Sequence, residues 1–208
     1  MRHFSFKPFS SSKKVADISD EQIIRNVANL MERKDWKEST KFLKMIDSPH
    51  ASFNIECADC TFQHNLLHAA CRCQAPLPVI KKIVNLCENQ ISELDCLYRL
   101  PFHVAVEFRG PYDVIEFLLK KKISAGSQVD AKQNTPLHTA LIGYKEKKDS
   151  YSDIDVKEYN DYLANVVRLL CRVAPSSLHE RNMKDLTPYE IACSEGANSE
   201  VLDMLYTR

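Results

Sequence analysis

Two cysteines and two histidines between residues 57 and 68 have the residue types and the spacing of a zinc site. Cys57 and Cys60 are separated by two residues, and His64 and His68 are four residues apart. Thiolate sulfur and imidazole nitrogen are the ligands that zinc takes in structural sites, and short spacings of this kind can bring them to one ion. The sequence therefore keeps open a metal-binding or redox-sensing site made by Cys57, Cys60, His64 and His68.

The other residues that could do chemistry do not combine into a recognisable catalytic site. The chain has only 4 glycines and lacks the GxxxxGK[ST], GxGxxG and GxSxG segments that form phosphate cradles and nucleophile elbows. No serine or cysteine has a histidine and an acid at a recognisable family spacing. We therefore predict that the protein is not an enzyme and that it needs no cofactor.

Composition and charge narrow the class of protein further. Of the 208 residues, 44% are hydrophobic, which is enough to build a core, and 28 basic residues balance 28 acidic ones. No overall positive field therefore indicates nucleic acid or an anionic membrane as a partner, and no apolar run approaches the roughly 18–20 residues that cross a bilayer. The 8 cysteines are scattered through apolar patterns, which is typical of free thiols. We expect a cytoplasmic or nuclear monomer.

A repeated pattern organises most of the chain. Four-residue segments that start at Asn65, Leu100 and Thr135 follow one another at intervals of 35 residues and end in histidine, and a related segment starts at Thr187. Each segment is followed by a second apolar pattern with helical spacing, which predicts two helices per repeat. In the third repeat this second pattern is displaced by a 17-residue insertion.

The starts of the first helices have a physical reason for their residue types. Thr135 and Thr187 can cap a helix with their hydroxyls, and each is followed by a proline, which suits the first helical position. Thr187 and Glu190 have the spacing of a capping box. Leu100 cannot cap, so we predict the weakest helix start there, by about 0.5–2 kcal/mol.

These residues carry a resemblance to the ankyrin repeat family. Thr-Pro-Leu-His at 135–138 is that family's motif, residues 182–188 are similar to its β-turn finger, and Asp95 and Asp130 stand where its fingers commonly have aspartate. The resemblance covers about residues 55–208 and implies an all-α fold, an ankyrin-type helix-pair repeat solenoid with short β-turn fingers. It also implies that His68 takes part in hydrogen bonds between repeats and that Cys60 lies in a finger, which argues against the zinc site.

The domain organisation follows from the repeats. Residues 1–18 are predicted to be a flexible basic tail, with an organelle-targeting presequence as the alternative. Residues 19–208 are predicted to form a single ankyrin-repeat domain, in which Asp35 caps the second helix of a degenerate first repeat. Its repeats are 19–60 (degenerate), 61–95, 96–130, 131–182 with the insertion at about 145–161, and 183–208.

The insertion is predicted to be a mobile loop that runs into a backward extension of the second helix by about two turns. Ser150, Tyr151 and Ser152 beside acids are candidates for phosphorylation, and a tolerated surface loop is the alternative.

The resemblance implies that a protein partner binds across the concave face made by the finger tips and the exposed side of the first helices. Several residues there are apolar, although packing between fingers would also explain them. We predict a non-catalytic protein–protein interaction module whose partner the sequence does not identify, with the metal or redox protein as the alternative. Carried over by position, the partner-binding residues are Phe62, His64, Arg72, Leu97, Tyr98, Arg99, Glu107, Phe108, Lys132, Asn134, Ile142, Lys184 and Glu195.

Three of these residues are expected to dominate binding. Tyr98 and Arg99 belong to one predicted finger, and Phe108 lies on the helix that follows it. Large amphipathic side chains near the centre of an interface carry most of its energy. Substituting any of the three by alanine is predicted to weaken binding about tenfold without lowering the melting temperature.

Overall fold

The computed structural model describes residues 20–46, 54–56, 63–144 and 153–206, whose regular elements are helices apart from one short pair of strands. This confirms the all-α class that the helical periodicity predicted. The predicted tail at 1–18, the first part of the insertion and the phosphorylation candidates lie outside the described residues.

The helices follow one another in pairs. In chain order they are α1 (Asp20–Glu32), α2 (Trp36–Leu43), α3 (Leu66–Arg72), α4 (Leu77–Leu86), α5 (Pro101–Glu107), α6 (Tyr112–Lys121), α7 (Pro136–Leu141), α9 (Asp153–Val173), α10 (Pro188–Ser194) and α11 (Ser199–Leu205). The 3-10 helices η2 (Glu88–Ser92), η3 (Ile123–Gly126) and η4 (Pro175–Leu178) follow α4, α6 and α9. Strands β1 (Asn54–Glu56) and β2 (Gln63–Asn65) pair antiparallel, with Ile55 opposite His64.

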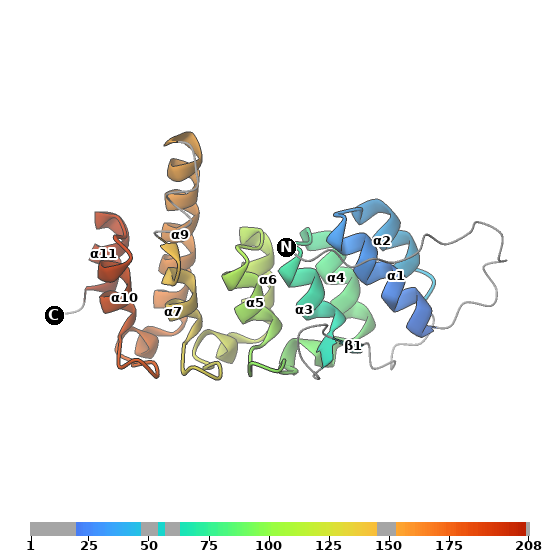
Figure 1. Ribbon diagram of the computed structural model, residues 1–208, viewed down its shortest axis with the longest axis horizontal. Coiled ribbons are helices and arrows are strands. Elements are labelled where there is room, and N and C mark those ends of the chain that lie inside the picture. Colours follow the sequence, from blue (N-terminus) through green and yellow to red (C-terminus); the bar gives the residue numbers. More distant parts are fainter. Residues whose placement is uncertain (1–19, 47–53, 57–62, 145–152, 207–208) are drawn as a thin grey trace.

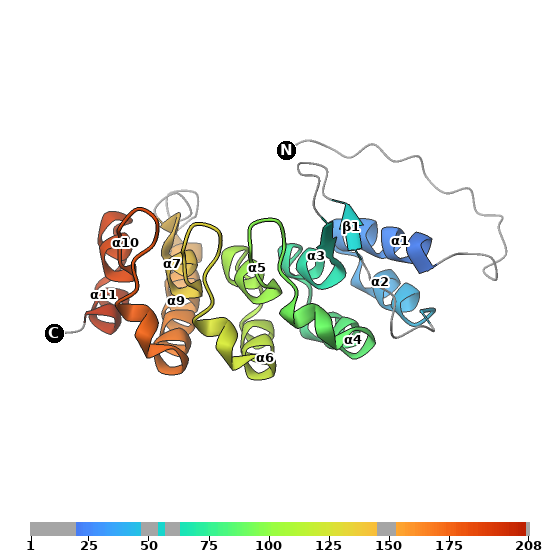
Figure 2. The same cartoon turned by 90° about the horizontal axis from the view of Figure 1, so that it is seen from below.

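The pairs lie side by side in a row, in two layers. Helices α3, α5, α7 and α10 form one layer and α4, α6, α9 and α11 the other (Figure 2). Within the first layer α3 packs on α5, α5 on α7 and α7 on α10, and each of these helices also contacts the following helix of its own pair. Three loops, residues 95–99, 130–134 and 182–186, connect a 3-10 helix to the first helix of the next pair, and we call them the fingers.

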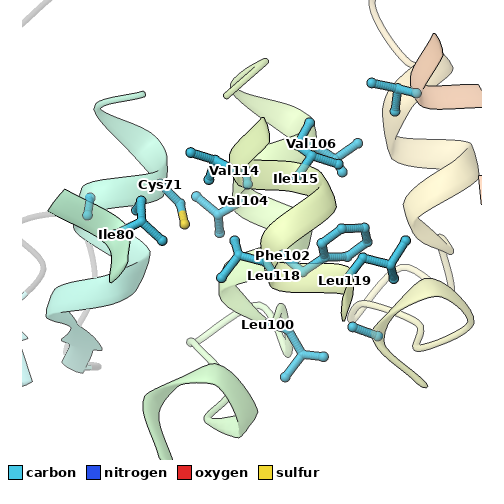
Figure 3. Close-up of a cluster of buried hydrophobic side chains, with 14 of the residues drawn as sticks. Cys71, Ile80, Leu100, Phe102, Val104, Val106, Val114, Ile115, Leu118 and Leu119 are labelled. Carbon is cyan, nitrogen blue, oxygen red and sulfur yellow. The ribbon is translucent and has the colours of Figure 1, made fainter. Parts of the chain in front are cut away.

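The core lies between the two layers. Ile80 of α4, Val104 of α5 and Ile115 of α6 come together there in Figure 3 and are at most 2% exposed. In the first layer small residues allow the helices to approach closely, since Ala70 and Ala105 are fully buried. The apolar positions predicted from helical spacing therefore form one continuous core along the row.

The helix starts largely follow the sequence prediction. At α10 the Thr187 hydroxyl accepts the Glu190 N–H at 3.3 Å and the Glu190 carboxylate accepts the Thr187 N–H at 2.7 Å, which confirms the capping box. Thr135 caps α7 as predicted. Leu100 offers no side-chain cap to α5, but His103 Nδ1 accepts the Leu100 N–H at 3.2 Å. This start is therefore weaker by one hydrogen bond rather than unanchored.

The N-terminal helices also form as predicted. Asp35 caps α2, since its carboxylate accepts the Glu38 N–H at 3.1 Å. Val27 and Met31 of α1 are fully buried, and α1 packs on both α2 and α3. The pair therefore extends the row at this end and covers the apolar side of α3.

Buried histidines link helices of the first layer to the segments that follow them, and His103 and His138 do so with the same hydrogen bonds. His103 Nε2 donates to the Gln128 carbonyl at 2.8 Å, and His138 Nε2 donates to the Leu186 carbonyl at 3.1 Å. In both rings Nδ1 accepts an N–H from the start of its own helix, which requires the neutral ring. Burial lowers the pKa of both histidines, and the carbonyl hydrogen bonds offset this only in part.

We expect the melting temperature to fall as the pH is lowered from about 7 to 5. A histidine whose pKa is lower in the folded chain binds fewer protons there than in the unfolded chain, so its stabilisation is complete above its ordinary pKa of 6.5 and is lost below it. Melting curves across this range test the effect. His103→Gln and His138→Gln should each flatten the pH dependence, and an unchanged slope in both variants would contradict this assignment.

The insertion lengthens the second helix of its pair more than expected. Helix α9 has 21 residues, whereas α4 and α6 have 10 each, so the extension is about three turns rather than the predicted two. The extra turns project beyond the other helices (Figure 1). The apolar stripe that predicted the extension begins at Val156, three residues after the start of α9, which explains the underestimate.

The extension is held by tyrosines. Tyr144 is fully buried and stacks on Tyr159 with ring centroids 5.5 Å apart, and its hydroxyl donates to Asn160 Oδ1 at 2.7 Å. On the other side the Tyr162 hydroxyl donates to the Gly110 carbonyl at 3.0 Å. The extension is therefore anchored to its own pair and to the loop between α5 and α6.

Replacing residues 145–152, which the sequence predicts to be a loop, by a short Gly-Ser linker should change the free energy of unfolding by less than about 1 kcal/mol, because the entropy of loop closure depends only weakly on loop length. Tyr144→Phe removes the hydrogen bond to Asn160 and should cost about 1 kcal/mol in the same assay. Urea unfolding measures both. A linker variant that is less stable than Tyr144→Phe would show that residues 145–152 contribute to the fold.

Candidate functional site

The three fingers share one turn, made by the first residue of each. Asp95 Oδ1 accepts the N–H groups of Leu97 and Arg99, both at 2.9 Å. Asp130 and Asn182 accept the equivalent pairs of N–H groups in the next two fingers at 2.8–3.2 Å. A side-chain acceptor that bonds the backbone two and four residues on fixes a tight turn, so each finger is preorganised.

The fourth residue of each finger has a left-handed backbone. The φ angles of Tyr98, Gln133 and Asp185 are 56°, 59° and 59°. This conformation is uncommon for residues other than glycine. Among those residues, asparagine and aspartate adopt it most readily. A tyrosine there is therefore the costliest choice among the three.

Backbone hydrogen bonds join neighbouring fingers. The Ala131 N–H donates to the Leu97 carbonyl at 2.9 Å, and the Met183 N–H donates to the Lys132 carbonyl at 3.0 Å. The fingers consequently present their tips along a single edge, as the three neighbouring loops of Figure 2 show.

Large apolar side chains project from this edge. Leu97, Tyr98 and Met183 are 45%, 64% and 72% exposed, and Ile142 at the end of α7 is 42% exposed. Lys132 and Lys184 of the tips are exposed as well. Met183 was not among the predicted partner-binding residues, although its finger position could have identified it.

Some predicted contact residues are engaged within the fingers instead. Asn134 is 5% exposed, and its side chain bonds both Asp130 and Asn182 at 3.1 and 2.9 Å. These contacts indicate that Asn134 holds neighbouring fingers in place and does not contact a partner directly.

Arg99 is likewise held by two acids. Its guanidinium pairs with Asp95 at 2.7 Å and with Glu107, and the Arg99 side chain is 15% exposed whereas that of Asp95 is fully buried. Burial alone would raise the pKa of Asp95, but the hydrogen bonds and charge of Arg99 outweigh it and lower that pKa below its usual range. Arg99 therefore neutralises a buried carboxylate, which the sequence prediction did not foresee.

Of the remaining predicted residues of the first-helix surface, Arg72 is exposed and the others lie at intermediate depth. Phe108 packs partly against the core, and the Arg72 guanidinium lies over its ring at 5.8 Å from the centroid. Glu107 and Glu195 are half-buried. Of the three residues expected to dominate binding, only Tyr98 is largely exposed.

Two of the four proposed zinc ligands, Cys57 and Cys60, lie outside the described residues, and only the backbone of His64 in β2 is described. The predicted partner-binding residue Phe62 also lies outside the described residues. His68 is described, and its Nδ1 and Nε2 lie 2.7 and 2.9 Å from Asn65 Oδ1 and the Arg99 carbonyl. A metal would have to displace one of these contacts. Among the described residues no group of three His, Cys, Asp or Glu side chains is arranged to hold a metal ion.

Cys71 and Cys73 of the α3 region are poorly suited to redox sensing. Burial raises the pKa of the Cys71 and Cys73 thiols, which disfavours the reactive thiolate. In Figure 3 the sulfur of Cys71 points into the core.

In the part of the chain that the structure describes, none of the helices has the length and apolar character needed to cross a membrane. In comparisons with known proteins, no protein-family model and no curated protein sequence matches the chain.

Proposed function

We propose that this chain is a non-catalytic protein-interaction module of the ankyrin-repeat type, which binds a protein partner along the edge of the fingers and the neighbouring face of the first helices. Support for the repeat solenoid comes from the matched helix pairs, the shared finger turn and the histidines that link one pair to the next. These features recur at the spacing of the sequence repeat.

The exposed finger tips carry the proposal. Leu97, Tyr98 and Met183 stand on a backbone fixed by buried acceptors and by hydrogen bonds between fingers, and they are 45–72% exposed. A rigid support reduces the entropy lost when an interface forms, and aromatic or apolar anchors gain the most from desolvation. The arrangement therefore favours recognition of a protein surface.

Affinity capture with the full chain as bait, followed by mass spectrometry, tests this function. A matched bait with Leu97→Ser, Tyr98→Ser and Met183→Ser distinguishes proteins that bind the finger tips from those that bind elsewhere. We expect at least one protein that the wild-type bait enriches and the matched bait does not. Two identical sets of captured proteins would contradict the proposed surface.

The metal or redox alternative has its own test. Elemental analysis of the purified full chain should find less zinc than one ion per molecule if Cys60 belongs to a finger, as the resemblance implies. A full equivalent of zinc that Cys57→Ser removes would favour the alternative.

A further inference from the structure

A second surface lies in the opposite layer, between α6 and α9. This surface is an open groove of about 370 Å³. It is lined by Glu116, Leu119 and Lys120 of α6, by Leu169, Arg172 and Val173 of α9, and by Ile123 of η3. Helices α6 and α9 are neighbours in the lower layer of Figure 2, away from the finger tips at its upper edge. The groove is therefore separate from the surface proposed above.

The preceding junction between pairs shows what this position ordinarily contains. There Lys121, the last residue of α6, pairs with Glu88, the first residue of η2, at 2.9 Å. The equivalent residues of the next junction are Val173, the last residue of α9, and Ile123, the first residue of η3. An ion pair is thus replaced by two apolar side chains, and Ile123 is 66% exposed.

The two junctions also differ in a residue that lies toward the preceding helix. Phe117 of α6 lies three residues after Val114 and packs beside α4, where Lys81 Nζ is 5.8 Å from its ring centroid. The equivalent residue of α9, three after Val166, is Leu169, which lacks an aromatic ring. The smaller side chain of Leu169 forms part of the apolar lining of the groove.

The rim of the groove is positively charged. Lys120 pairs with Glu116 at 3.1 Å within α6, so these two charges compensate each other. Arg172 is exposed and makes no ion pair with any residue in the described ranges. One cation therefore remains beside an apolar groove whose volume is near the lower end of the roughly 300–1,000 Å³ of small-molecule pockets.

We propose that this groove docks a peptide segment of a partner protein that presents an aliphatic side chain next to a carboxylate. The aliphatic group packs on Leu119, Leu169 and Ile123, and the carboxylate pairs with Arg172. An exposed apolar patch rimmed by charge is typical of a protein-interaction site, and the net charge of the rim selects an acidic segment.

A phage-displayed library of random linear peptides, selected on the full-length protein, tests the proposal. We expect the enriched peptides to carry Asp or Glu beside Leu, Ile or Val, and their affinity to fall at least tenfold on Ile123→Ser and on Arg172→Glu. Both residues are exposed, so circular dichroism should show an unchanged fold. Leu94→Ser, a matched loss of an exposed aliphatic side chain outside both proposed surfaces, should leave the affinity unchanged.

Three results would overturn the proposal. They are the enrichment of no peptide, the selection of peptides that bind both groove variants as tightly as the wild type, and a concentration-dependent dimer that Ile123→Ser abolishes in sedimentation. The last result would assign the groove to a second copy of the chain. None of these outcomes bears on the finger surface, whose test uses different variants.

Discussion

Arg99→Leu should lower the free energy of unfolding by about 3 kcal/mol, the low end of the range for breaking a buried ion pair. The substitution keeps apolar bulk but leaves the Asp95 carboxylate, which is fully buried, without its counterion. The N–H groups of residues 97 and 99 still bond that carboxylate, which keeps the loss from being larger. Urea unfolding at neutral pH measures the effect.

The third finger supplies a matched control for this prediction. It has Asn182 and Leu186 where the first finger has Asp95 and Arg99, and Asn182 makes the same backbone hydrogen bonds without a charge. The double variant Asp95→Asn/Arg99→Leu should therefore recover most of the lost stability. Equal losses in the single and double variants would show that Arg99 stabilises the finger by packing rather than by charge.

The pH dependence of the Arg99→Leu effect gives a second check. The pKa of Asp95 is lowered in the folded chain, so the stabilisation from its ionised form is present above its ordinary pKa of 3.8 and is lost as the pH falls further. A neutral carboxyl needs no counterion. The difference between wild type and variant should therefore shrink below about pH 4.

Tyr98→Gly should weaken partner binding at least tenfold and leave the free energy of unfolding unchanged or slightly raised. Tyr98 is 64% exposed, so few contacts are lost within the chain, and its φ of 56° is one that glycine adopts without strain. The removal of a tyrosine from an interface centre commonly costs about 2 kcal/mol or more. Stability would thus be separated from binding at a single position.

Gln133→Gly is the matched control, because Gln133 has the same place and nearly the same φ in the next finger. It should affect stability as Tyr98→Gly does and weaken binding less. Affinity for the captured partner and the melting temperature are measured on both variants. Normal affinity of Tyr98→Gly would remove Tyr98 from the interface.

The helices could be predicted from the sequence because the information for them is local. Helical spacing placed the buried faces, and capping residues such as Thr135, Thr187 and Asp35 marked the helix starts. The displaced second pattern located the insertion after His138. None of these predictions required knowing which segments meet in space.

The roles of individual site residues depended on contacts that the repeat pattern does not contain. Arg99 was predicted to contact a partner, but the finger turn brings it onto Asp95 and onto Glu107 of the following helix. Asn134 is likewise committed to its neighbours. The groove beside Ile123 depends on how α6 packs against α9. It could therefore not be predicted from the repeat pattern.

The histidine contacts have a consequence for the order in which the chain assembles. His68 and Arg99, which form the earlier contact, are 31 residues apart, whereas His138 and Leu186 are 48 residues apart because the insertion lies between them. Closing the longer loop costs about 0.4 kcal/mol more conformational entropy, or about a twofold slower closure. During refolding we therefore expect α3 to α7 to associate first, and α10 and α11 to dock last.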